Sequence, residues 1–452
     1  MSTEERVNRV RPESVPKNGA TGYGRFLRGL VWILAYAWFQ VGLTIVFFLG
    51  IDLICFLISP LTIGSTQERD LANLRRTPII GAYPQITWLR DYYRVYDNLK
   101  DRWYPYSYFV MSPTASSYIN INSQGVRTTW QTSYKHNPAW VRPLKIFMFG
   151  GSTMFGESNR DEYTIPSILA RRLAALLPEI PVVVTNFGQW GYASTQELLL
   201  LAQQLRNGKL PDLVIFYDGC NEVATAYQNR AAGLTYDELD LATEFRILDP
   251  DRRFLLSGYA IYNILRFSYC GLTADWLAGR LIPRWLSDRR TKLFAAHLAA
   301  SNLGGQESIG ERLADQTVEA YIFNKHLVED LARRFGFSAL FYWQPVVYEK
   351  ASKSLFERRV NDETEAIYPG SRRLYVLAYQ QMREKSAKAH IIDLDRVFSD
   401  MRESYYTDEC HIIEPGNRTI VDAMLPSVIA TLRGRTSGQH RIQSPPPSPG
   451  PH

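Results

Sequence analysis

Short apolar segments alternate with amphipathic segments from residue 144 onward, and this alternation restricts the fold more than any other feature. Apolar stretches of strand length occur at residues 145–149, 182–185, 213–216, 339–342 and 391–394. Helical spacing of apolar residues occurs between them, at residues 161–177, 195–205, 318–334 and 374–387. Strands and helices that alternate in this way form a parallel sheet covered by helices on both faces. The sequence therefore predicts an α/β domain.

Four motifs with chemically useful residues occur in order along this domain, and three of them directly follow predicted strands. Ligands of open parallel sheets bind at the carboxyl ends of the strands, so residues in these places are candidates for a site. The motifs are residues 149–153 (FGGST) with Ser152, residues 186–191 (NFGQWG) with Gly191, residues 218–222 (DGCNE) with Asn221, and the pair Asp408 and His411.

Ser152 and His411 are candidates for a nucleophile and its base. A serine hydroxyl is a weak nucleophile and needs a base within hydrogen-bond reach. Gly150 and Gly151 allow a tight turn before Ser152, although this serine could also be a simple helix cap. Asp408 stands three residues before His411, where it could orient the imidazole, although such a pair also occurs by chance on surfaces. Together with the other motifs, these residues favour a catalytic triad.

Gly191 and Asn221 are candidates for an oxyanion hole, which needs preorganised hydrogen-bond donors. The backbone N–H of Gly191 and the side-chain amide of Asn221 are both suitable donors. The simpler alternatives are that Gly191 is only a turn glycine and that Asn221 is only a turn or cap residue.

Other site chemistries find little support in the sequence. The Gly150–Ser152 turn lacks the lysine of a phosphate-binding loop, and no H-E-x-x-H motif is present. The four cysteines have no metal-ligand spacing, so no metal site is expected. The net charge of +6 is spread over scattered basic residues, which predicts no nucleic-acid surface.

In these motifs the chain resembles the SGNH (GDSL-like) hydrolase family, and the resemblance covers roughly residues 115–430. Residues 122–127 also resemble the segment that precedes the catalytic domain in membrane-tethered bacterial members of the family. The resemblance implies a three-layer, flavodoxin-like parallel sheet and cofactor-free esterase or acyl-transfer chemistry. It implies Ser152, Asp408 and His411 as catalytic residues. It assigns the oxyanion hole to Ser152, Asn221 and Gly191, with Gly188 as a close competitor of Gly191. The departures are Glu222, where many members have Asp, and two cysteines beside the site.

The N-terminal region contains an uncharged run at residues 29–50, long enough as a helix to cross the roughly 30 Å hydrocarbon core of a membrane. We expect residues 29–58 to form a transmembrane anchor, rather than a cleaved signal peptide or a buried core helix. The basic flank predicts that residues 1–28 are a cytoplasmic tail. The expected location is therefore the inner membrane, single-pass, with the catalytic domain periplasmic or extracellular.

The remaining segments complete the predicted organisation. Residues 59–143 are a juxtamembrane lead-in, with strand-like alternation at 118–122 and a turn at 122–125. The hydrolase domain spans residues 144–432 and contains an insertion at 223–310. Its aromatic, basic part at 254–286 is either a helical cap or a lid that touches a membrane or an acyl chain. Residues 433–452 are a disordered Pro-rich tail.

The sequence thus predicts a membrane-anchored serine esterase that acts through an acyl-enzyme on O-acyl groups of envelope glycans or lipids. One alternative is an O-acyltransferase for a polysaccharide with the same residues, and another is a non-catalytic glycan-binding or assembly subunit. The membrane and an acylated substrate are the expected partners, and the sequence identifies no protein partner. Cys220 and Cys410 are expected to lie close together, either as a disulfide or as two buried thiols.

Overall fold

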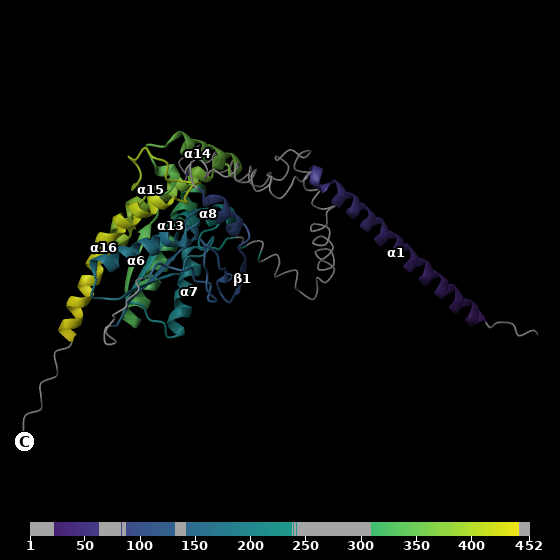
Figure 1. Cartoon of the computed structure of the whole chain (residues 1–452), viewed down its shortest axis with the longest axis horizontal. Coiled ribbons are helices and arrows are strands. Elements are labelled where there is room, and N and C mark those ends of the chain that lie inside the picture. Colours follow the sequence, from purple (N-terminus) through teal and green to yellow (C-terminus); the bar gives the residue numbers. More distant parts are fainter. Residues whose placement is uncertain are drawn as a thin grey trace, which may run out of the picture. The chain divides into compact units, whose positions relative to one another are not determined.

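The computed structural model describes residues 22–62, 83, 87–131, 142–236, 238, 241 and 309–442 (Figure 1). Helix α1 and the sheet-containing domain belong to two separate compact units and are described one at a time. The aromatic and basic segment at 254–286, for which a cap or lid was predicted, lies outside the described residues.

Helix α1 is a single long apolar helix, Gly22–Thr62. Its stretch Phe26–Leu57 has a mean hydropathy of 2.2 and is long and apolar enough to cross a membrane, a property that a signal sequence near an N-terminus shares. Large apolar side chains are exposed all around it, including Trp32 and Trp38. The helix contains the predicted anchor at residues 29–58, beginning seven residues before it at Gly22 and ending at Thr62.

The central sheet of the other unit has five parallel strands in the order β4-β3-β5-β6-β7. If the five strands are numbered 1 to 5 along the chain, their order in the sheet is 2-1-3-4-5. This is the order of flavodoxin-like folds, which the family resemblance implied. The central strand is buried along its whole length, as expected for a parallel sheet covered on both faces. The strands are β3 Leu144–Gly150, β4 Val182–Asn186, β5 Leu213–Asp218, β6 Ser338–Trp343 and β7 Ile392–Asp393.

Helices form a layer on either side of this sheet (Figure 1). Helices α6 and α16 pack against each other, while α13 packs against α7, α8 and α15. The fold is therefore a three-layer α/β fold, and the predicted class is confirmed. The helices are α5 Ser152–Phe155, α6 Ile165–Leu176, α7 Ser194–Arg206, α8 Cys220–Asn229, α13 Ile309–Phe335, α14 Leu355–Ile367, α15 Ser371–Ala389 and α16 Glu414–Ile442, with short 3₁₀ turns at Asp161–Tyr163 and Val347–Glu349.

A row of stacked phenylalanines crosses the sheet and fixes the relative position of its central strands. Phe149 is the register partner of Phe216, and Phe216 is the partner of Phe341. Their ring centroids are 5.1 and 5.5 Å apart along the row. This core holds rigidly the strand ends from which the site residues extend.

The lead-in forms helix α4 (Leu89–Tyr96) and a hairpin of β1 (Asp101–Tyr104) and β2 (Tyr108–Met111). The strand predicted at 118–122 is wrong, because only isolated bridges from Ile121 to Thr114 and Arg127 occur there. The side chain of Asn122 accepts hydrogen bonds from the backbone N–H groups of residues 124 and 126 and bends the chain before a ladder can form. The predicted turn is confirmed, with Gly125 at φ 78° donating its N–H to the Asn122 carbonyl.

Arg127 ties this lead-in to the loop that follows helix α5. Its side chain is fully buried and its Nε is 2.8 Å from Asp161 Oδ1. Its remaining nitrogens donate to the carbonyl oxygens of Phe155, Gly156 and Asn159. A buried guanidinium with so many acceptors holds this loop in one conformation.

Two predicted boundaries differ from the helices observed. Helix α8 continues to Asn229, past the predicted start of the insertion at 223, and α13 begins at Ile309. Helix α16 continues to Ile442, so the part of the predicted tail that the structure describes is helical. Residues 443–452 lie outside the described part.

Candidate active site

The candidate site lies at the carboxyl end of the sheet, where the chain order reverses between β3 and β5. Ligands of open α/β sheets bind at such a switch point. A cavity of about 700 Å³ opens there, and Ser152, Gly191, Asn221 and His411 all contribute to its lining. A cavity of this size is in the usual range for small-molecule sites.

Gly150, the last residue of β3, and Gly151 pack closely against their neighbours and turn the chain so that Ser152 begins helix α5. A Cβ atom on Gly150 would come within 2.6 Å of Met154 Cβ and 2.8 Å of the Tyr217 carbonyl oxygen. A Cβ on Gly151 would come within 1.9 Å of Asn221 Nδ2. Neither position accepts a larger residue without displacing its neighbours, so glycine is required at both.

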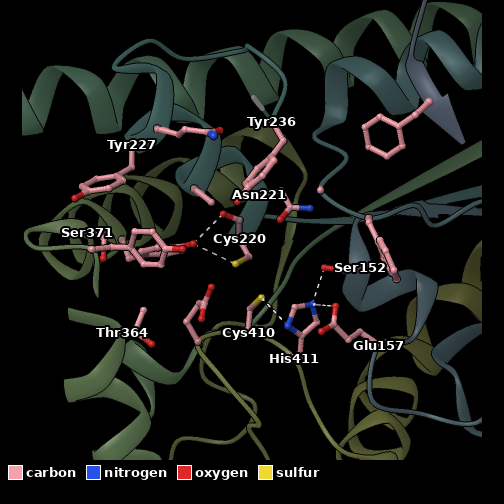
Figure 2. A pocket seen from close by; sticks show the side chains of 18 of the residues that line it. Ser152, Glu157, Cys220, Asn221, Tyr227, Tyr236, Thr364, Ser371, Cys410 and His411 are labelled. Carbon is pink, nitrogen blue, oxygen red and sulfur yellow. Dashed lines mark hydrogen bonds and ion pairs between the residues drawn. The ribbon is translucent and has the colours of Figure 1, made fainter. Parts of the chain in front are cut away.

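Ser152, His411 and Asp408 form a continuous row of short contacts, of which Figure 2 shows the contact between Ser152 and His411. Ser152 Oγ lies 2.6 Å from His411 Nε2. On the opposite side of the ring, His411 Nδ1 lies 2.6 Å from Asp408 Oδ2. The three predicted residues are thus brought together in the geometry of a nucleophile, a base and an orienting carboxylate.

Asp408 is oriented by the turn in which it stands. Its Oδ1 accepts hydrogen bonds from the backbone N–H groups of Cys410 and His411, at 3.0 and 2.8 Å, which leaves Oδ2 for the imidazole. The turn is closed by the backbone N–H of Thr407, which donates to the His411 carbonyl oxygen. Burial raises the pKa of Asp408, but the charge and hydrogen bonds of His411 outweigh it, and the net pKa is lowered. Asp408 is therefore a carboxylate at neutral pH.

Glu157 is a second carboxylate at the same histidine, and sequence reasoning missed it. Its Oε2 lies 3.1 Å from His411 Nε2, the nitrogen that also faces Ser152 (Figure 2). Burial lowers the pKa of His411, but Asp408 and Glu157 raise it, and the net pKa is well above the usual 6.5. Burial raises the pKa of Glu157, and the charge of His411 only partly offsets this.

The predicted oxyanion donors surround the Ser152 end of the cavity. Asn221 uses one amide hydrogen on the Tyr192 carbonyl oxygen at 2.7 Å, so its second hydrogen remains for a ligand. Gly191 lines the cavity in a left-handed conformation, at φ 60°. Among the described residues, no hydrogen-bond acceptor contacts the backbone N–H of Ser152 or of Gly191.

Gly188, the competitor of Gly191, occupies a different environment. Its N–H donates to Asn186 Oδ1 at 2.9 Å. A Cβ at this position would lie 2.2 Å from the backbone nitrogen of Phe155. Gly188 therefore packs against helix α5, and of the two glycines it is Gly191 that faces the cavity.

Glu222, the residue at which the motif departs from many SGNH members, connects two loops of the site. Its Oε1 accepts from the Ser194 N–H at 2.8 Å, just after the Gly191 loop. Its Oε2 accepts from the Gly219 N–H at 2.7 Å, just before Asn221. The glutamate therefore holds the loops that carry Gly191 and Asn221 at a fixed separation.

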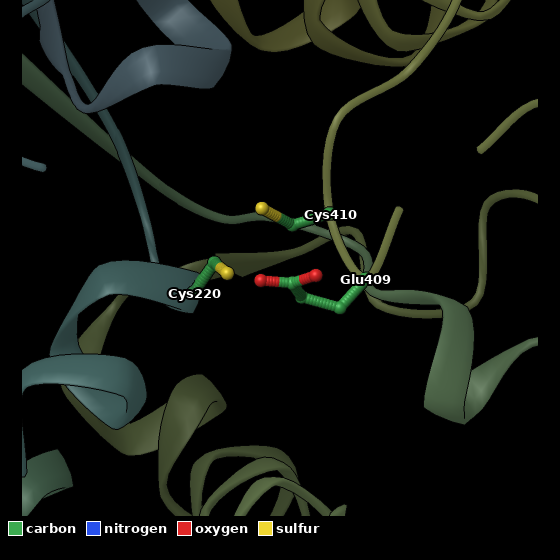
Figure 3. A group of neighbouring side chains, drawn as sticks. All are labelled: Cys220, Glu409 and Cys410. Atoms are coloured by element: carbon green, nitrogen blue, oxygen red, sulfur yellow. The ribbon is translucent and has the colours of Figure 1, made fainter. Parts of the chain in front are cut away.

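Cys220, Glu409 and Cys410 form a cluster at the edge of the cavity (Figure 3). The two Sγ atoms and a carboxylate oxygen of Glu409 all lie within 4.8 Å of one another. Both cysteines are free and buried, which corresponds to the second of the two predicted states. A hydrogen bond with Cys220, together with burial, raises the pKa of Cys410 well above its usual value. Thiols and a carboxylate are groups that could ligate zinc, although the sequence pattern predicted no metal site.

Comparison with known proteins places these features in context. No protein-family model matches the sequence, and neither does any curated protein. Among solved structures, a carbohydrate acetylesterase family member from Sinorhizobium meliloti is similar at 13% identity and a TM-score of 0.33, over 64% of this chain and 98% of that one. A lipolytic protein of the G-D-S-L family from Veillonella parvula is similar at 10% identity and a TM-score of 0.32, over 62% and 96%. The acetyl xylan esterase AlAXEase is similar at 12% identity and a TM-score of 0.31, over 63% and 99%.

The fold class follows from the strand order. A 2-1-3-4-5 parallel sheet carries the four motifs in chain order along its carboxyl edge. The chain therefore has the three-layer, flavodoxin-like fold that the resemblance to SGNH (GDSL-like) hydrolases implied.

Proposed function

We propose that this protein is a serine esterase that cleaves O-acyl groups of glycans or lipids through an acyl-enzyme. The observation that carries the proposal is the uninterrupted contact from Ser152 through His411 to Asp408 at the wall of a cavity. A serine hydroxyl so placed can be activated by an imidazole whose tautomer is fixed by a carboxylate.

Acylation begins when Ser152 Oγ attacks the ester carbonyl carbon and His411 Nε2 takes the hydroxyl proton. Asp408 stabilises the imidazolium that forms. The carbon–oxygen bond to the alcohol then breaks, and Nε2 returns the proton to the leaving oxygen. Water repeats the sequence on the acyl-enzyme and releases the carboxylic acid and free Ser152.

The tetrahedral intermediates carry a negative oxygen, and three donors are placed to stabilise it. They are the backbone N–H groups of Ser152 and Gly191 and the free amide hydrogen of Asn221. Because Tyr192 and Glu222 hold these donors before substrate binds, no reorganisation is needed when charge develops.

The cavity lining supports a substrate with both flat apolar and hydroxyl surfaces. Aromatic residues from three regions of the chain line the cavity, including Tyr96, Trp190 and Tyr236. The carboxylates of Asp101, Glu157 and Glu409 also line the cavity and are acceptors for hydroxyl groups. Rings that cover sugar faces and carboxylates that accept sugar hydroxyls are suited to an acylated glycan.

We further propose that α1 anchors the protein in the inner membrane with residues 144–432 outside the cytoplasm. The support is the apolar, exposed surface of α1 and the basic residues before it. A periplasmic reporter fused after residue 432 is expected to be active and a cytoplasmic reporter silent. The reverse pattern would overturn the proposed orientation without affecting the proposed chemistry.

The esterase proposal is tested by labelling the purified protein with a fluorophosphonate probe. Labelling is expected for the native chain and absent from Ser152→Ala. Ser371→Ala is the matched control, because it removes a hydroxyl from the wall of the same cavity without touching His411. Labelling that persists in Ser152→Ala would refute the assignment of the nucleophile.

A further inference from the structure

Glu157 lies where a second reactant must meet the catalytic histidine. His411 Nε2 has Ser152 Oγ at 2.6 Å and Glu157 Oε2 at 3.1 Å. The proposed reaction requires Nε2 to exchange a proton with two further oxygens, those of the leaving alcohol and of the attacking hydroxyl compound. An oxygen that binds Nε2 beside Ser152 Oγ therefore shares that nitrogen with the Glu157 carboxylate.

The backbone of Glu157 is fixed directly to that of Ser152. Its N–H donates to the Ser152 carbonyl oxygen at 3.0 Å, and the N–H of Gly156 donates to the same oxygen at 2.9 Å. Gly156 adopts φ 95°, and a Cβ on it would lie 2.4 Å from Thr164 Cγ2. Arg127 holds the Gly156 carbonyl oxygen at 2.7 Å. The carboxylate therefore extends from a rigid loop whose position is set by the nucleophile itself.

The side chain is also placed to contact a ligand. It is about one-fifth exposed and lines the cavity together with Tyr96 and Trp190. A carboxylate is acceptor-only when ionised, so it can take a hydrogen bond from a hydroxyl group that enters the cavity. Asp408 already orients His411 from Nδ1, so Glu157 is not needed for that task.

We propose that Glu157 is a positioning residue for the hydroxyl compound that resolves the acyl-enzyme, and that this compound offers two hydrogen-bond donors. One O–H gives its proton to His411 Nε2 as its oxygen bonds to the acyl carbon. The second donor binds Glu157. The bond from the acyl carbon to Ser152 Oγ then breaks, and Nε2 returns the proton to Oγ. Water has two such donors on one oxygen, and a vicinal diol of a sugar has them on neighbouring oxygens.

This inference rests on the proposed acyl-enzyme. It is tested by measuring the formation of the acyl-enzyme separately from the step in which a hydroxyl compound resolves it. With p-nitrophenyl acetate the leaving group needs no proton, so acylation does not require Glu157. In Glu157→Gln we expect a rapid burst approaching one nitrophenolate per active site, followed by a steady state slowed by at least about tenfold, as expected when a group that assists proton transfer is lost. The native protein is the reference for both phases.

Two controls make the outcomes distinct. Glu179→Gln removes an exposed carboxylate that does not line the cavity, and it should not produce the burst. Ser152→Ala should show neither phase, and a burst in that variant would overturn the acyl-enzyme proposal instead. An equal loss in both phases of Glu157→Gln, or no loss in either, would overturn the role of Glu157.

The identity of the hydroxyl compound is read from product partition in methanol and in glycerol. If the site takes a vicinal diol, the native protein transfers the acetyl group to glycerol in preference to methanol, and Glu157→Gln loses that preference. If the site takes water, the native protein shows no preference, and the variant loses hydrolysis alone. A preference for glycerol that is unchanged in Glu157→Gln would contradict the proposal.

Discussion

Asn221 packs its side-chain amide against Gly151, so closely that a methyl group on the glycine would come within 1.9 Å of Nδ2. The amide is simultaneously fixed by its hydrogen bond to the Tyr192 carbonyl oxygen. The turn that presents Ser152 and the side chain proposed as an oxyanion donor therefore define each other's positions. In the proposed mechanism, this relationship makes the glycine before Ser152 a structural part of the oxyanion hole, although it has no reactive group.

Gly151→Ala should displace the Asn221 amide and weaken transition-state stabilisation. Removing one oxyanion donor typically costs about 10²–10³ in kcat. We expect a loss of that size, measured with a soluble ester, while circular dichroism shows an intact fold. Gly434→Ala serves as a control, because a Cβ there meets nothing within 4 Å. Full activity in Gly151→Ala would mean that the oxyanion does not use Asn221.

Asp408→Asn should reduce turnover by up to about 10⁴, the size of effect known for the orienting aspartate of serine proteases. The amide cannot stabilise the imidazolium and can favour the wrong tautomer. Steady-state kinetics on a soluble ester measure the effect. Since Asp408 Oδ1 also holds two backbone N–H groups, a thermal melt is needed beside the kinetics. A reduction below about tenfold would assign the orienting role to another carboxylate.

The pH dependence of kcat/KM should follow His411. Only the neutral imidazole can accept the Ser152 proton, so activity rises as pH increases through the His411 pKa. Asp408 and Glu157 hold that pKa above 6.5, against the effect of burial, so the acid limb should lie above pH 6.5. Glu157→Gln removes one of the raising charges and should move the limb to lower pH. A limb below pH 6.5 in the native protein would contradict this reading of the site.

Strands and turns that depend only on residues close together in the sequence could be predicted from local patterns. The predicted strand at 213–216 forms the first four residues of β5, because an unbroken apolar run has one stable place in a three-layer fold. The residues of the candidate triad could be picked out because a D-x-x-H turn and a Gly-Gly-Ser turn are each local structures, and the fold brings Ser152 Oγ within 2.6 Å of His411 Nε2. The strand at 118–122 was wrong because alternation is a weaker local signal than the Asn122 turn.

Glu157 and Tyr96 could not be found in this way, because their importance arises from the tertiary fold. Glu157 stands in a segment without periodicity, and only the contact with His411, 254 residues later in the chain, reveals it. Tyr96 ends a helix of the lead-in that no pattern linked to the hydrolase domain. Both side chains reach the cavity through packing between distant segments.

A buried pair of acids on neighbouring elements gives the last prediction. Glu197 on α7 is fully buried, and Asp218 at the end of β5 is almost so. Among the described residues, neither oxygen of Glu197 has a hydrogen-bond partner, and Asp218 Oδ2 has none either. Burial and the nearby charges of Asp218 and Glu222 raise the pKa of Glu197 well above its usual 4.5. The folded protein therefore retains a proton that the unfolded chain releases.

This retained proton makes the free energy of unfolding fall as pH rises above about 4.5, the unfolded value. The loss continues until the folded pKa is reached, at up to about 1.4 kcal/mol per pH unit for one proton. Glu197→Gln keeps the size and shape of the side chain but cannot release a proton, so the free energy of unfolding of the variant should depend less on pH. The stability of the variant relative to the native protein should therefore be greater at pH 8 than at pH 5. Urea unfolding at both pH values measures the difference, with the exposed Glu179→Gln as control. If Glu197→Gln retained the native pH dependence, the proton would have to reside on another group.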